Sequence, residues 1–262
     1  GTPEEVAKPW SVCTRGEKTI DDLCRCLEKE AKSFLFASEE QPAKCAADPG
    51  APSLGDPRLS LVNVTVEFPA ARVPVVVAKD GDVYRAVASL GEEYNPGAFG
   101  IFNELNVQGG TSRTYKGRIV AAIRHELLGH DANYAGLEVC EHTSIRHELL
   151  GHDANYAGLE VCEHTERAHT ICVIGQGATP TTCPVTVPLE ITSGCGVGVD
   201  IAVDEADVET SELMKEIKAN ATSSKVTASY SIDDDGKLTA KVTSGDAKMI
   251  PKHVLRERAL LR

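Results

Sequence analysis

The sequence predicts an α+β fold in which β-strands flank a central helical segment. Runs rich in β-branched residues, separated by turn signals, occupy 59–90 and 169–244. Between these runs, the apolar residues of 117–130 recur at helical spacing. The helical region also holds a tandem duplication, because the segment 123–143 returns unchanged at 145–165 and the period from Ile123 to Ile145 is 22 residues.

The N-terminal part is expected to be a helical, cysteine-containing segment with a linker, over residues 1–58. The stretch 19–36 has apolar residues at helical spacing and acidic residues near its start, as a helix N-terminus favours. The stretch 39–57 is dense in Pro, Gly and Asp, which is typical of a long loop. We therefore expect a boundary near residue 58.

A domain with a metal site is expected over 59–170. Three strands are predicted at its start, at 59–68, 72–78 and 82–90. The period then changes, because Ile119, Ile123 and Leu127 lie on one helical stripe. The pattern predicts a helix that begins near residue 116 and ends with the hexapeptide HELLGH at 125–130.

The C-terminal part, 171–262, is expected to be β-rich, either separate or in one domain with 59–170. A helix is predicted at 211–220, and the last segment, 251–262, is expected to be a short amphipathic helix or a basic tail. A hairpin turn is predicted at 233–236. The strands are predicted at 169–175, 184–192, 196–203, 224–232 and 236–244.

Charge and cysteine content restrict the function classes. The net charge of −12 argues against a nucleic-acid partner, and no apolar run approaches the roughly 18 residues of a membrane span. Nine cysteines are present, and removing one repeat unit leaves an even set without a CxxC pair. This predicts four disulfides in a secreted or periplasmic protein; the alternative is that several cysteines are free buried thiols. If the protein is exported, we expect a mature or trimmed chain, because the first ten residues lack the features of a signal peptide.

Six of the eight histidines lie inside the repeat, which points to a metal site. A catalytic zinc ion commonly takes three protein ligands and a water, and a neighbouring Glu can accept the proton of that water. His125 and His130 are five residues apart, so a regular helix would separate them by roughly 140°. A single π-type turn at Gly129 would bring them together. Zinc on His125 and His130, with Glu126 as the base, is therefore expected.

The second copy offers the same groups, His147, Glu148 and His152. We favour the first copy, because burial of its apolar lead-in fixes its position. The third ligand is expected to be Glu138, which a following helix could present toward the ion. The other candidates for this ligand are Asp131, Glu141, His142, Glu166 and His169.

The hexapeptide resembles the HExxGH zinc motif of the dipeptidyl peptidase III family of metallopeptidases. The resemblance implies zinc on His125 and His130 and a general base at Glu126. It covers six residues in each copy, and the family's glutamate-rich third-ligand motif has only a faint echo at 138–141. The wider similarity is to zincin-like proteins, with a zincin-like central helix.

Two functions are therefore expected from different classes. The first is zinc-dependent hydrolysis of a peptide or protein substrate, by a metal-activated water with Glu126 or Glu148 as general base. The alternative is a non-catalytic, disulfide-stabilised secreted binding or structural protein that carries a tandem helix duplication. The sequence indicates no oligomeric state.

Overall fold

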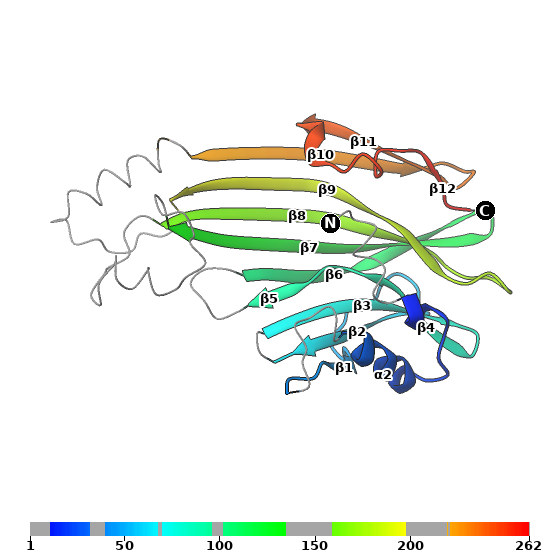
Figure 1. Cartoon of the computed structure of the whole chain (residues 1–262). Helices are drawn as coiled ribbons and strands as arrows, with labels where there is room; N and C mark the ends of the chain where they lie inside the picture. The colour runs from blue at the N-terminus through cyan, green and yellow to red at the C-terminus, as the bar shows by residue number, and fades with distance from the viewer. Residues whose placement is uncertain are drawn as a thin grey trace.

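The computed structural model describes residues 11–31, 40–67, 70–95, 102–134, 159–197, 219 and 221–261, and these form one large antiparallel sheet (Figure 1). The strands follow the order β1-β2-β3-β5-β6-β7-β8-β9-β10-β11-β12, and β4 pairs with β3. Most neighbours in the sheet are therefore neighbours in the chain.

The described helices and strands have the following bounds. They are η1 (Ser11–Thr14), α2 (Ile20–Ala31), β1 (Lys44–Ala47), β2 (Leu59–Val66), β3 (Ala70–Asp80), β4 (Val83–Ser89), β5 (Glu93–Asn95), β6 (Phe102–Tyr115), β7 (Arg118–Tyr134), β8 (Leu159–Val173), β9 (Thr182–Val197), β10 (Thr222–Ile232), β11 (Lys237–Gly245), η2 (Ala247–Met249) and β12 (Arg258–Ala259).

The predicted α+β fold with a central zincin-like helix is wrong, because the segment expected to be that helix is the strand β7. It pairs with β6 along one edge and with β8 along the other. Burial follows a strand period here, since Ala121, Ile123 and His125 are buried while Arg124 between them is exposed. The same residues fit a helical stripe, and the pairing with two long neighbours decides the conformation.

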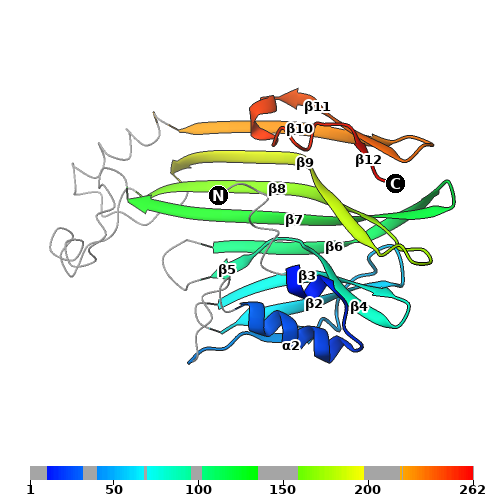
Figure 2. The ribbon, with the colours of Figure 1, turned by 45° about the vertical axis from the view of Figure 1, so that its right-hand side comes forward.

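The core lies on both sides of β2 and β3. On one side, α2 buries Leu23 and Leu27 against Val64 and its neighbours (Figure 2). On the other side, Leu61 and its neighbours belong to one cluster with Ile123 of β7. The sheet therefore curls so that β2 and β3 pack against β6, β7 and β8. A third cluster joins β7 to β11 with the C-terminal segment.

Four disulfides are present, which confirms the number predicted from the cysteine content. Two disulfides tie α2 to neighbouring segments, and two join β8 to β9. The pairs are Cys13–Cys26, Cys24–Cys45, Cys162–Cys195 and Cys172–Cys183. The ninth cysteine, Cys140, lies outside the described residues. Four disulfides fit an oxidising, extracellular environment.

Several predicted elements are confirmed. The first helix is α2, the three strands after residue 58 are β2, β3 and β4, and the turn at 233–236 is closed by a 2.9 Å hydrogen bond from Gly236 N to Asp233 O. The expected loop at 39–57 contains β1, and 251–261 forms turns and β12 instead of a helix. Most of the predicted helix at 211–220 and most of the strand at 196–203 lie outside the described residues.

The domain boundaries stay a prediction, although β8 extends across residue 170 and the sheet continues on both sides of it. Among the helices that the structure describes, none combines the length and the apolar character needed to cross a membrane.

Candidate functional site

His125, the first predicted zinc ligand, lies on the face of β7 that packs into the core. Its side chain is 6% exposed, and its Nε2 shares a 3.0 Å hydrogen bond with Thr170 Oγ1 on β8. Burial, with a further contribution from the charge of His169, lowers the pKa of His125 to about 4. His125 is therefore a neutral, hydrogen-bonded core histidine at neutral pH.

Glu126, the predicted general base, follows His125 in the strand and so belongs to the opposite face of the sheet. Its Oε1 accepts a 2.9 Å hydrogen bond from Arg167 Nε, and its Oε2 accepts a 3.3 Å bond from Gln108 Nε2. Both carboxylate oxygens are thus occupied by neighbours in the sheet. Glu126 and His125 do not face a common site.

Glu126 is one member of a row of polar side chains across five strands, which we call the charge ladder. Arg167 lies between two carboxylates, since it also bonds Glu190 at 3.5 Å, and Lys225 Nζ lies 2.8 Å from Glu190 Oε2. The signs alternate across the strands, so each charge lies beside an opposite one. The ladder comprises Gln108, Glu126, Arg167, Glu190 and Lys225.

The predicted zincin-type arrangement of His125 and His130 is therefore wrong. A strand alternates its faces at every residue, so positions five apart, such as 125 and 130, do not share a face. Within the part of the chain that the structure describes, no three His, Cys, Asp or Glu side chains could hold a metal ion together. Glu138, His147, Glu148 and His152 lie outside the described residues. Zinc binding and hydrolysis themselves stay predictions.

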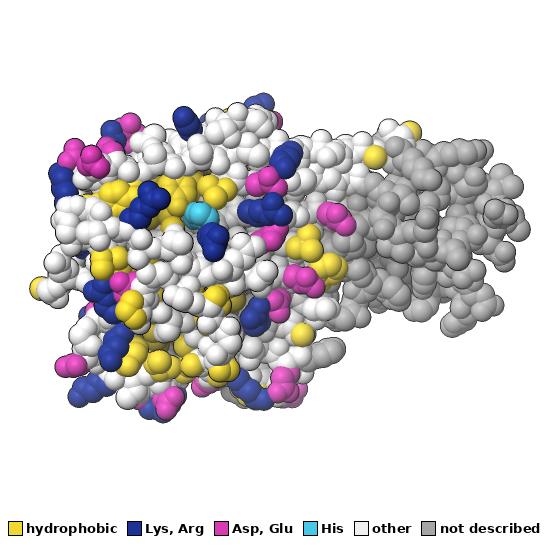
Figure 3. All heavy atoms as spheres, turned by 180° about the vertical axis from the view of Figure 1, so that it is seen from behind, with side chains coloured by type: hydrophobic (Ala, Val, Ile, Leu, Met, Phe, Trp, Pro, Cys, Tyr) yellow, Lys and Arg dark blue, Asp and Glu magenta, His cyan; other side chains and the backbone are white. Residues whose placement is uncertain are grey.

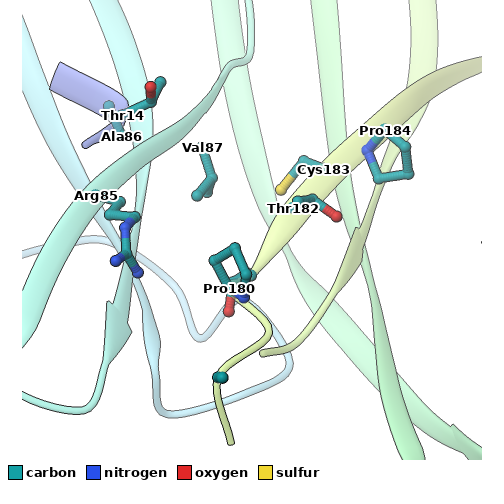
Figure 4. A pocket seen from close by; sticks show the side chains of 10 residues that line it. Thr14, Arg85, Ala86, Val87, Pro180, Thr182, Cys183 and Pro184 are labelled. Carbon is teal, nitrogen blue, oxygen red and sulfur yellow. The ribbon is translucent and has the colours of Figure 1, made fainter. Parts of the chain in front are cut away.

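A pocket of about 480 Å³ opens between β4 and the start of β9 (Figure 4). Arg85, Val87, Pro180 and Cys183 are among the residues that line it. A second hollow, of about 540 Å³, lies beside it and shares Arg85 and Pro180. Hollows of this size are common ligand sites, so the polar groups around them decide what they can do.

Those polar groups already bind one another. The carboxylate of Asp80 accepts hydrogen bonds from Thr181 N at 2.9 Å, from Thr181 Oγ1 at 2.6 Å and from Arg85 at 3.0 Å. Asp56 accepts two 2.8 Å bonds from Arg58, and these hydrogen bonds lower the pKa of the Asp56 carboxyl. Arg58 also donates to Gly175 O at 3.2 Å. The network fastens the β8–β9 turn to β3.

A second polar cluster lies on the same face as the charge ladder. His169 Nδ1 and Tyr230 OH are 2.9 Å apart, and the two rings meet edge to face with centroids 5.7 Å apart. Tyr230 is on β10, so its side chain extends over β9 to reach β8. Arg124 lies directly opposite His169 in the β7–β8 register. We call Arg113, Tyr115, Arg124, His169 and Tyr230 the basic patch.

Burial and neighbouring charges shift the pKa of both His169 and Tyr230. Burial, followed by the charge of Arg124, lowers the pKa of His169, so this ring is neutral at pH 7. Burial and nearby Tyr115 raise the pKa of Tyr230, while Arg113 opposes them. Both guanidinium groups are therefore close enough to influence the pair electrostatically.

The arginines of the basic patch differ from those elsewhere on this face. Arg167 in the charge ladder has two carboxylate partners. Arg113 and Arg124 form no ion pair with any residue that the structure describes. Figure 3 shows a face of the molecule on which a histidine lies between basic side chains and a hydrophobic area. Among the described residues, the two arginines of the basic patch are therefore cations without a carboxylate partner.

Sequence reasoning named His169 only as a possible third zinc ligand and did not single out Arg113, Arg124 or Tyr230. Arg124 was expected in a helix and Arg113 in no strand, and only the register from β6 to β10 brings these residues to one face. Comparisons of this chain with models of protein families, with curated proteins and with solved structures found no match.

Proposed function

We propose that this protein is a non-catalytic, disulfide-stabilised binding protein, secreted or periplasmic, and that the basic patch holds an oxyanion group of its ligand. One observation carries the proposal. Arg124 lies opposite His169, Arg113 acts on Tyr230 electrostatically, and neither arginine has a carboxylate partner among the described residues.

The chemistry of the patch favours an anion. Each guanidinium group offers N–H donors and no acceptor. If Tyr230 donates to His169 Nδ1, then the neutral ring presents its Nε2–H outward; in the other tautomer, the phenol O–H is the outward donor. The patch presents donors in both cases. Carboxylate, phosphate and sulfate groups accept such bonds, and charge-assisted bonds are the stronger kind.

The surroundings support recognition of a negatively charged group. The chain as a whole carries a net charge of −12 and repels anions at long range, so an anionic ligand would be held only where positive charge is in local excess, as at the basic patch. Arg124 and His169 belong to strands paired on both edges, and Cys172–Cys183 ties β8 to the start of β9. The sheet thus fixes the backbone positions from which these side chains extend.

The described polar groups also favour binding over catalysis. Glu126 is bonded through both oxygens, His125 is buried, and Thr181 is bound to Asp80. His125 is enclosed by the core and Glu126 is held by two donors, so neither is a free base of the kind that a hydrolytic step uses.

A titration followed by NMR tests the oxyanion site. Inorganic phosphate and acetate are added in parallel at pH 7, so that phosphate and carboxylate recognition are told apart. We expect at least one anion to shift the ring resonances of His169 in a saturable way. The substitutions Arg113→Gln and Arg124→Gln should each weaken binding about tenfold or more, because each removes a charge-assisted bond.

The repeat supplies a matched control for this titration. Arg146 has the same sequence neighbours in the second copy as Arg124 has in the first, from Ile123 to Thr143. Arg146→Gln should leave the anion affinity unchanged. Equal weakening by Arg124→Gln and Arg146→Gln, or no shift of His169 with either anion, would reject the site.

The non-catalytic part of the proposal has a separate test. The protein is supplied with zinc and incubated with a mixture of peptides, and the products are analysed by mass spectrometry. We expect no cleavage. Cleavage that disappears in Glu126→Gln or Glu148→Gln would contradict the proposal and favour zinc-dependent hydrolysis.

A further inference from the structure

The two copies of the repeat contribute different strands to the sheet. The end of β7, up to Tyr134, comes from the first copy, while the start of β8, from Leu159, comes from the second. These strands pair continuously, with Tyr134 opposite Leu159 and Leu128 opposite Thr165. The sheet therefore uses the first half of one copy and the second half of the other.

The register identifies the structure of one repeat unit. Leu159 in the second copy corresponds to Leu137 in the first, one period of 22 residues earlier. The same pairing within a single copy would place Tyr134 opposite Leu137, with only Ala135 and Gly136 between them. A two-residue loop is the commonest connection of a β-hairpin, and glycine is favoured in it.

We infer that the repeat unit is one β-hairpin with an Ala-Gly turn, and that the duplication is an insertion at the tip of this hairpin. The sheet takes one arm from each copy. One full period of 22 residues, out of the stretch 135–158, is then surplus to the fold.

Loop entropy and strand continuity explain why the arms come from different copies. If both arms came from the same copy, the extra residues would leave the sheet in mid-strand, either after Ala122 or after Thr143. β7 and β8 are each paired on both edges, so such an exit would break ladders with two neighbours. At the hairpin tip the same insertion only lengthens a loop, and the entropic cost of a longer loop grows slowly.

According to this inference, residues that are identical in the two copies have different structural roles. Ile123 is fully buried, and Arg124 lies opposite His169. Cys162 lies opposite Cys195 and is bonded to it. Their counterparts Ile145, Arg146 and Cys140 lie outside the described residues, and the inference assigns them no role in these ladders. This asymmetry does not depend on the proposed binding function.

A deletion tests whether the insertion is surplus. Removing residues 135–156 joins Tyr134 to Ala157, and every 22-residue deletion that starts from 123 to 144 produces the same sequence. We expect a folded protein with the same four disulfides and a higher urea midpoint than the parent. A variant that fails to form the disulfide to Cys195, or that does not fold, would overturn the inference.

Matched substitutions test which arm each copy supplies. Ile123→Ala should lower the urea midpoint, because it opens a cavity in the core, while Ile145→Ala should leave it unchanged. Cys162→Ser should remove the native disulfide to Cys195, while Cys140→Ser should retain it. Equal effects within the isoleucine pair, or loss of the Cys195 bond in Cys140→Ser, would overturn the inference.

Tryptic mapping can tell the two cysteines apart although their neighbours are identical. Cleavage after arginine places Cys140 in the peptide 125–146, which ends in Ser-Ile-Arg, and Cys162 in the peptide 147–167, which ends in Glu-Arg. In the parent protein we expect the peptide that contains Cys195 to be linked to 147–167. A predominant link to 125–146 would show that both arms come from the first copy.

Discussion

At the scale of single residues, burial decides what each histidine can do. His125 and His169 are separated by one position in the β7–β8 register, yet they belong to opposite faces of the sheet. His125 is enclosed by the core, with Thr170 as its hydrogen-bond partner, and Thr170 is in turn 2.8 Å from Thr186 Oγ1. His169 is partly exposed and lies opposite Arg124. The first is structural, and the second can meet a ligand.

The buried state of His125 predicts a pH-dependent stability. Its pKa in the folded protein is about 4, below the ordinary value of 6.5, so the unfolded chain binds the proton more readily. The stabilising effect is complete above about pH 6.5 and is lost as the pH falls toward about 4. The loss should approach about 3 kcal/mol in the free energy of unfolding. Urea titrations at pH 7 and pH 4.5 measure it.

The control for this prediction is the exposed histidine His253. His253→Gln should keep the full difference between the two pH values. His125→Gln should reduce it, with a remaining part from His169, whose pKa is shifted in the same direction. An unchanged difference in His125→Gln would show that this side chain is not the source.

At the scale of elements, the contribution of a polar network to stability depends on how far water reaches it. The charge ladder joins five strands, but Arg167 at its centre is 57% exposed, so each of its ion pairs contributes little. The Asp80 network is largely enclosed and links the β8–β9 turn to β3. Buried groups of this kind are costly to leave without partners.

This contrast predicts unequal effects of two substitutions. Asp80→Ala should lower the free energy of unfolding by about 3 kcal/mol, because it leaves the Thr181 N–H and Arg85 without their acceptor. Glu190→Ala should lower it by less than about 1 kcal/mol, because its partners Arg167 and Lys225 are reached by water. Equilibrium unfolding in urea compares them. Similar losses in both variants would contradict the assignment of the Asp80 network as a structural clamp.

At the scale of the whole molecule, one sheet accommodates a duplication without losing its order. All strands from β6 to β10 pair with their chain neighbours, and we infer that the extra period falls between β7 and β8. The sequence has 24 residues between Tyr134 and Leu159, where a single unit would leave two.

Loop closure predicts the size of the effect on stability. Shortening this loop by one period should raise the free energy of unfolding by about 2 kcal/mol, because closure entropy scales with the logarithm of loop length. Chemical denaturation of the deletion variant and the parent, both fully oxidised, measures the difference. A clear loss of stability would mean that the inserted residues contribute contacts to the fold.

The amino-acid sequence alone was enough to place α2, the strands around residues 59–89 and 224–245 and the turn at Asp233, and to give the number of disulfides but not their pairing. These features depend on local patterns and on the number of cysteines. Only the tertiary structure decided the conformation of 118–134, because its apolar residues fit both a helical stripe and an alternating strand, and pairing with β6 and β8 selects the strand. That choice separates His125 from Glu126 and brings Arg124 to His169. The candidate site could not be predicted from the sequence. Its contacts depend on the register between strands that are far apart in the chain.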